Sequence, residues 1–113
     1  MKNLAIARRY AKALLLIGKE DGQTETYRQE LNDFSELMDR ERELSQAINN
    51  PLYDAAARKK VLGTVLGKLS LSKMMNAFLL LLFDKGRVSF LSNINEFYQT
   101  LADELKGTDA TVV

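Results

Sequence analysis

The sequence contains no cysteine, no histidine and no tryptophan, and only one proline among its 113 residues. Without histidine there is no Ser-His-Asp triad and no imidazole to act as acid or base near neutral pH. The absence of both cysteine and histidine excludes an ordinary structural zinc site, and without cysteine there is no disulfide framework. These absences argue against an enzyme, so we expect no catalytic residue, no metal ion and no cofactor.

Long apolar runs are also missing. The longest extends from Ala77 to Phe83, far short of the ~20 residues that a membrane-spanning helix needs. Arg8 and Arg9 fall where a signal peptide would carry its apolar stretch. If the protein works at a membrane, we expect a partner to hold it there, without direct insertion.

The sequence does contain helical periodicity, which extends from Leu4 to Leu105, whereas strand signals are nearly absent. Turn and capping signals divide this stretch into six segments and predict an all-α, six-helix bundle. The predicted helices are Leu4–Glu20, Thr24–Arg40, Glu41–Ile48, Asp54–Leu69, Ser70 or Ser72 to Lys85, and Val88–Lys106.

Particular residue types predict where these helices begin and end. Thr24 and Asp54 carry side-chain oxygens suited to N-caps. Gly22 and Gly86 suit the left-handed position that follows a helix. Gly107 is expected to end the last helix, and the residues after it are expected to be extended.

Two features of the fourth predicted helix allow more than one interpretation. The basic tract Arg58-Lys59-Lys60, with Lys68 and Lys73, is either a solvated helix face or a nucleic-acid patch, although no exposed aromatic is interleaved with it. Gly63 and Gly67 form a GxxxG without the Lys-Ser of a phosphate loop. We expect these glycines to allow close packing against a neighbouring helix.

The first and fifth helices carry more apolar surface than a single core contact needs. On the first helix the apolar arc covers roughly 200°, about twice an ordinary core stripe. On the fifth, every residue from Met74 to Phe83 except Asn76 is apolar. Either both helices are interior, or they leave an exposed groove that receives an apolar helix from a partner.

Three segments of the chain resemble one known family. Ala7–Leu14 (ARRYAKAL) resembles the opening motif of the delta subunit of F-type ATP synthases, the oligomycin sensitivity-conferring protein family. Leu82–Val88 (LFDKGRV), with Leu91, resembles the apolar helix of that family that ends in Gly-Arg. Asn50-Pro51, followed by Lys60–Leu62, is similar to the family's link between its third and fourth helices.

The resemblance implies a non-catalytic subunit of the peripheral stalk, or stator, supporting ATP synthesis driven by proton translocation. It implies a helical amino-terminal domain at residues 1–106 and the start of a linker at 107–113, leading to a carboxy-terminal part outside this chain. The implied partners are the amino-terminal helix of an alpha subunit, at the top of the catalytic head, and the b subunits, reached through that carboxy-terminal part. The implied location is the cytoplasmic face of the bacterial inner membrane, as a peripheral component.

The resemblance also implies a partner-binding groove between the first and fifth helices. Ala13 would matter there by being small, since a large side chain would block the approaching helix. The implied groove residues are Ile6, Tyr10, Ala13, Leu14, Ile17, Met74, Phe78, Leu81, Leu82 and Lys85.

A different class of function remains as an alternative. The chain could be a small all-helical RNA-binding module that resembles transcription antitermination factors. Its supporting features are Arg8, Arg9 and Lys12 together with Arg58-Lys59-Lys60. Salt-dependent binding to RNA would favour this alternative, whereas the main hypothesis expects no nucleic acid as partner.

Overall fold

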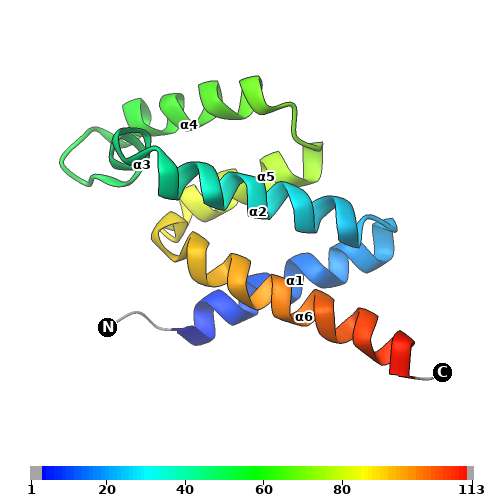
Figure 1. Ribbon diagram of the computed structural model, residues 1–113. Helices are drawn as coiled ribbons and strands as arrows, with labels where there is room; N and C mark the ends of the chain where they lie inside the picture. Colours follow the sequence, from blue (N-terminus) through cyan, green and yellow to red (C-terminus); the bar gives the residue numbers. More distant parts are fainter. Residues whose placement is uncertain (1–3, 112–113) are drawn as a thin grey trace. The chain divides into compact units, whose positions relative to one another are not determined.

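The computed structural model of the chain describes the backbone of residues 4–111 and the side chains of residues 4–106. The described residues form six α-helices and one short 3-10 helix, without a strand, which confirms the all-α fold (Figure 1). In chain order the elements are α1 (Leu4–Asp21), α2 (Thr24–Arg40), α3 (Arg42–Asn49), α4 (Ala55–Leu69), α5 (Lys73–Asp84), the 3-10 helix η1 (Val88–Phe90) and α6 (Leu91–Thr111).

Two of the predicted helix ends are wrong. The last helix does not stop at Gly107 but continues to Thr111, because a glycine inside a helix costs only about 1 kcal/mol and no proline follows to stop it. The predicted extended tail is therefore helical as far as Thr111, and the rest of it lies outside the described residues. Thr24 is the first residue of α2 and not its N-cap, since the Tyr27 amide already donates to the Gln23 carbonyl (2.9 Å).

The predicted glycine stops at Gly22 and Gly86 are confirmed. Both residues have φ of 69°, in the left-handed region that glycine enters without a steric penalty. In each case the following amide donates back to a helix carbonyl, at 2.8 Å to Gly18 and 2.7 Å to Leu82. These paired bonds form the Schellman motif, which satisfies carbonyls that the helix end leaves free.

Side chains cap the helices of the middle of the chain. The Asp54 carboxylate accepts a hydrogen bond from the Ala57 amide (3.4 Å), which confirms Asp54 as the N-cap of α4. Ser72 caps α5 in the same way through the Met75 amide (3.2 Å). Between these caps, α4 ends at Leu69, and its C-cap is Ser70, a non-glycine residue in the left-handed region (φ 55°, ψ 42°).

The chain divides into two compact units. The first contains residues 1–32 and 90–113, so it holds α1, the beginning of α2 and α6. The second contains residues 33–89, with the rest of α2, then α3, α4, α5 and most of η1.

In the first unit, α1 packs against α6 (Figure 1). Ala7 and Ala11 on α1 and Ala102 on α6 have no exposed surface, and small side chains of this kind let two helices approach closely. Ile94 and Tyr98 of α6 are also fully buried and are among the largest of the fully buried side chains. This unit therefore combines close helix contact with a core of large side chains.

Polar side chains join the start of α2 to α6. Arg28 donates from Nε to Gln99 Oε1 (2.6 Å) and pairs with the Asp103 carboxylate. The Asn95 amide donates to Asn32 Oδ1 (3.1 Å). Because each bond needs a particular partner, this row fixes the register of α2 along α6.

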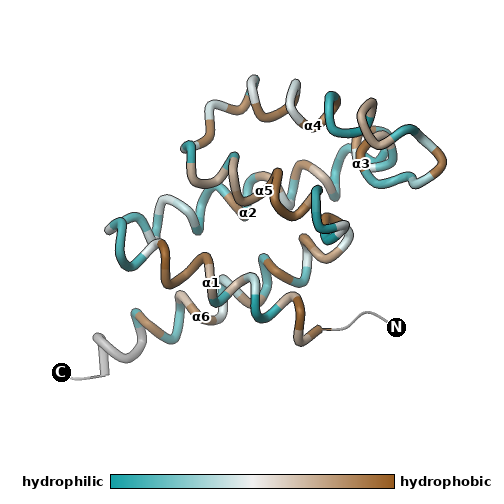
Figure 2. Tube along the Cα trace, turned by 180° about the vertical axis from the view of Figure 1, so that it is seen from behind, coloured by the Kyte–Doolittle hydropathy of each residue, from teal (hydrophilic) through white to brown (hydrophobic). Residues whose placement is uncertain are grey.

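In the second unit, α4 and α5 bury apolar side chains on one side only. Figure 2 shows α5 as largely hydrophobic along its length. The buried residues of α4 are Leu62 and Leu66, and those of α5 are Met75, Phe78, Leu79 and Leu82. The remaining apolar residues of α5 are therefore left partly or largely exposed.

Candidate functional site

The predicted partner-binding residues of α1 differ in how far their side chains are exposed. Ala13 is exposed, and Ile6, Tyr10 and Ile17 are half-buried. These four lie at positions i, i+4, i+7 and i+11, so they share one face of the helix. Leu14 has no exposed surface, so it is a core residue and is not available to a partner.

The predicted residues of α5 divide in the same way. Leu81 is 43% exposed, Met74 is half-buried and Lys85 is exposed at the helix end. Phe78 is only 6% exposed and Leu82 has no exposed surface. Phe78 and Leu82 are thus core residues of the second unit, and their contact with a partner stays a prediction.

Sequence reasoning missed Ala77 as a member of the exposed face of α5. It is exposed, and with Met74, Leu81 and Lys85 it lies at positions i, i+3, i+7 and i+11. The spacing was available in the sequence, but a helix that is apolar on nearly every side gives no signal for which side is covered. We call this set the outer stripe of α5, and Ile6, Tyr10, Ala13 and Ile17 the outer stripe of α1.

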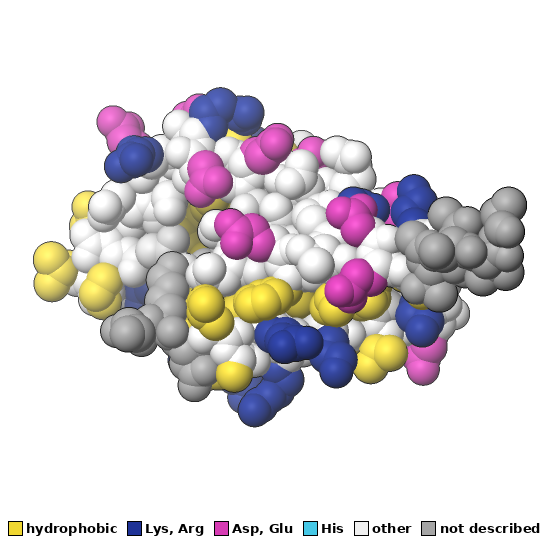
Figure 3. All heavy atoms as spheres, turned by 60° about the horizontal axis from the view of Figure 1, so that its bottom comes forward, with side chains coloured by type: hydrophobic (Ala, Val, Ile, Leu, Met, Phe, Trp, Pro, Cys, Tyr) yellow, Lys and Arg dark blue, Asp and Glu magenta, His cyan; other side chains and the backbone are white. Residues whose placement is uncertain are grey.

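Basic residues accompany exposed apolar residues on α1. Arg8, Arg9 and Lys12 are exposed, and Leu16, one turn beyond Lys12, is 58% exposed. Figure 3 shows one face of the molecule on which apolar side chains form a row with Lys and Arg side chains along one edge. Such a combination is typical of a surface that contacts an amphipathic partner.

Arg58, the first residue of the basic tract, makes three contacts within the second unit. Its Nε donates to the Tyr53 carbonyl (3.1 Å), and its Nη1 donates to the Ile48 carbonyl (3.3 Å). The guanidinium carbon also lies 5.4 Å from the centre of the Phe83 ring, within the range of a cation–π contact. Arg58 is therefore engaged inside the protein and is not a free surface cation.

The second residue of the tract is also paired. Lys59 Nζ lies 3.0 Å from the Asp84 carboxylate, with both side chains about half exposed. Lys60 is exposed. Two of the cations that the RNA-binding alternative invokes therefore have partners within the second unit.

The glycines of α4 do not pack against a neighbouring helix. A Cβ atom built on Gly63 or on Gly67 would have no neighbour within 4 Å among the described residues. Both positions are exposed. The predicted close packing at this GxxxG is therefore wrong for the described part of the chain.

Two tyrosines near the α1–α2 turn have altered acidity. The Tyr27 hydroxyl donates to the Asp21 carboxylate (2.6 Å), and this bond, with a smaller effect of burial, raises the pKa of Tyr27 to about 12. Burial raises the pKa of Tyr98 to about 12, and its hydroxyl donates to the Thr24 carbonyl (2.8 Å). Both phenols tie neighbouring segments together, which is a structural role.

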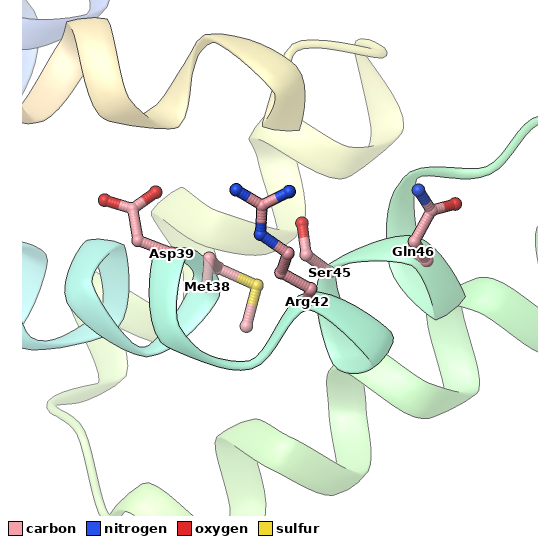
Figure 4. Close-up of a pocket in the computed structure, with 5 residues that line it drawn as sticks. All are labelled: Met38, Asp39, Arg42, Ser45 and Gln46. Atoms are coloured by element: carbon pink, nitrogen blue, oxygen red, sulfur yellow. The ribbon is translucent and has the colours of Figure 1, made fainter.

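The hollow between α2 and α3 does not resemble a ligand site. Figure 4 shows this hollow, which has a volume of about 240 Å³ and is lined by Met38, Asp39, Arg42, Ser45 and Gln46. It is smaller than the roughly 300–1,000 Å³ of ordinary ligand pockets, and only one of these residues is apolar.

Among the described residues, no three acidic side chains lie close enough to hold a metal ion. No described helix has both the length and the apolar character that crossing a membrane requires.

Comparison with known proteins gives a consistent result. The sequence model of the family described as "ATP synthase delta (OSCP) subunit" matches residues 6–113. The ATP synthase subunit delta of Desulforapulum autotrophicum is 56% identical over the whole chain, which covers 62% of that relative. That of Desulfosudis oleivorans is 57% identical over 95% of the chain and 58% of the relative. The chain thus spans about three fifths of the length of these relatives.

A solved structure has the same fold. It is a chain in the cryo-EM structure of the Polytomella F-ATP synthase in rotary substate 2A, from a focussed refinement of the F1 head and rotor. The TM-score is 0.80 over 88% of both chains, and the sequence identity is 24%. At this level of identity the likeness concerns the fold alone.

Proposed function

Because the chain belongs to the ATP synthase delta (OSCP) subunit family, we propose that it forms the amino-terminal domain of a stator subunit. In this proposal the domain binds the amino-terminal helix of an alpha subunit at the top of the catalytic head. In this proposal a carboxy-terminal part that follows the domain engages the b subunits of the stalk. The protein would then be a non-catalytic, peripheral component at the cytoplasmic face of the bacterial inner membrane.

The observation that carries the proposal is the pair of outer stripes. A helix that docks on another protein repeats its anchors every three or four residues, and it needs a surface with the same repeat. The α1 stripe consists of Ile6, Tyr10, Ala13 and Ile17, and the α5 stripe of Met74, Ala77, Leu81 and Lys85. We propose that each stripe, within its own unit, offers such a surface to the alpha-subunit helix.

The proposed mechanical role explains why the domain needs exposed apolar surface. A rotary motor delivers torque only if its head is kept from turning with its rotor. The joint needs a slowly dissociating contact and no chemistry. If about 400 Å² of apolar surface is buried, at about 25 cal/mol per Å² the gain is about 10 kcal/mol, before association costs of about 4–15 kcal/mol.

A substitution at Ala13 tests the contact. Ala13 is exposed, so Ala13→Trp is expected to leave the fold intact while its bulk blocks the approaching helix. We expect the affinity for a synthetic alpha-subunit amino-terminal peptide, measured by calorimetry, to fall at least about tenfold, which is about 1.4 kcal/mol.

The matched control is Ala56→Trp. Ala56 is also an exposed alanine within a helix, but it lies in the first turn of α4, outside both stripes. The control is expected to bind the peptide like the unsubstituted chain. Equal affinity of a folded Ala13→Trp variant would show that α1 does not contact the peptide through this stripe.

A further inference from the structure

Two adjacent cations of α4 hold two adjacent residues at the end of α5. The Arg58 guanidinium lies over the Phe83 ring, and Lys59 pairs with Asp84 at 3.0 Å. These residues come from two helices of the same unit. The last turn of α5 is thereby fixed against α4 from two sides, once through a ring and once through a carboxylate.

Arg58 also connects this turn to the segment before α4. Its guanidinium donates to the carbonyl of Ile48, near the end of α3, and to that of Tyr53, in the loop that follows. Two carbonyls and one ring face therefore share a single planar group with fixed donor directions. Lysine, with one flexible ammonium, cannot reproduce this arrangement.

The turn that these cations hold carries part of the α5 outer stripe. Leu81 lies two residues before Phe83, and Lys85 follows Asp84 directly. The helix ends there in the Schellman bonds around Gly86, and helix ends fray unless something holds them. A shift of this turn would displace Leu81 and Lys85 together.

We infer that Arg58 and Lys59 are positioning residues, which hold the end of α5 so that Leu81 and Lys85 can engage the partner helix. This inference rests on the proposed function, since it names how one half of the contact is kept in place. The Lys59–Asp84 pair is half exposed, and such pairs add little to global stability. Its effect is therefore local and separable from folding.

The test uses charge reversal and peptide binding. Lys59→Asp places two carboxylates side by side, and the double variant Lys59→Asp with Asp84→Lys restores the pair in reverse. We expect the single variant to bind the alpha-subunit amino-terminal peptide about three- to tenfold more weakly, and the double variant to bind within about twofold of the unsubstituted chain. Arg58→Lys is expected to weaken binding by a similar factor, because lysine lacks the planar guanidinium that contacts the two carbonyls and the Phe83 ring. Lys60→Gln, a neighbouring exposed cation outside these contacts, is the control and is expected to change nothing.

Hydrogen exchange of the free chain supplies a second measurement. The amides of Lys85, Gly86 and Arg87 donate to carbonyls of the last turn of α5. They are expected to exchange faster in Lys59→Asp and Arg58→Lys, and at the original rate in the double variant, while amides in the middle of α4 stay unchanged. A purely global effect would instead accelerate all of these amides equally.

The two proposals fail in different ways. If the unsubstituted chain does not bind the peptide, both the proposed function and the inference that rests on it are overturned. If that chain binds and Lys59→Asp binds equally well, or if reversal does not restore affinity, only the inference is overturned. Should Arg58→Lys fail to fold, the Lys59 and Asp84 variants still decide the question.

Discussion

The same substitution, glycine to alanine, is expected to have opposite effects at two helical positions. Gly18 is buried near the end of α1, and Gly63 is exposed in the middle of α4. A Cβ atom on Gly18 would lie 3.1 Å from the Thr24 Cα and 3.3 Å from a ring carbon of Tyr27. A Cβ atom on Gly63 would have no neighbour within 4 Å among the described residues.

These distances decide whether each substitution raises or lowers the free energy of unfolding. Alanine is favoured over glycine in a helix interior by about 1 kcal/mol. Gly63→Ala keeps this gain, so the free energy of unfolding is expected to rise by about 0.5–1 kcal/mol. At Gly18 the nearest obstacle is backbone, and overpacking of this kind costs about 1–3 kcal/mol. Gly18→Ala is therefore expected to lower the free energy of unfolding by up to about 2 kcal/mol.

Urea unfolding followed by circular dichroism measures the difference directly. The two variants are expected to differ by about 1–3 kcal/mol with equal m-values, or by several degrees in Tm. If Gly18→Ala stabilises the chain as much as Gly63→Ala does, the packing argument at the α1–α2 turn is refuted. A loss of stability in Gly63→Ala would instead mean that this face of α4 is covered.

Two further predictions concern backbone strain and alkaline pH. Ser70→Gly is expected to raise the free energy of unfolding by about 0.5–1 kcal/mol in the same urea experiment, because Ser70 adopts the left-handed conformation that glycine tolerates. The pKa values of Tyr27 and Tyr98 are raised to about 12 in the folded chain, above about 10 when unfolded, so their stabilising contribution is complete below about pH 10 and is lost as the pH rises towards 12. Absorbance titration at about 295 nm is expected to show both phenols ionising well above pH 10. Tyr27→Phe, which loses the bond to Asp21, is expected to reduce the loss of stability at alkaline pH. Ionisation of both tyrosines near pH 10 would contradict this reasoning.

Features that depend on local geometry could be predicted from the sequence. Gly22 and Gly86 end their helices in the predicted conformation, and Asp54 caps α4 as expected. In each case a single residue type satisfies a requirement of the backbone next to it. Gly107 shows the limit of such signals, since the helix continues through it when nothing further along stops it.

Features that depend on which side of a helix is covered could not be predicted. The sequence pattern predicts Leu14 and Leu82 on a partner surface, but both are fully buried in the described chain, whereas Ala77, outside that prediction, is exposed. On a helix that is apolar on nearly every side, all faces fit a core equally well. Gly63 and Gly67 illustrate the same limit, because a GxxxG permits close packing without supplying the neighbour.

The basic tract shows how a charge pattern and a structural role can share the same residues. In the sequence, Arg58-Lys59-Lys60 is a run of cations that could face a polyanion. In the structure, the first two are committed to a ring, two carbonyls and a carboxylate within the second unit. The α1 stripe needs no such device, because α1 is fixed by buried small side chains against α6. Under the proposed function, both solutions keep the outer stripes in shape before the partner helix arrives, which lowers the ordering cost of binding.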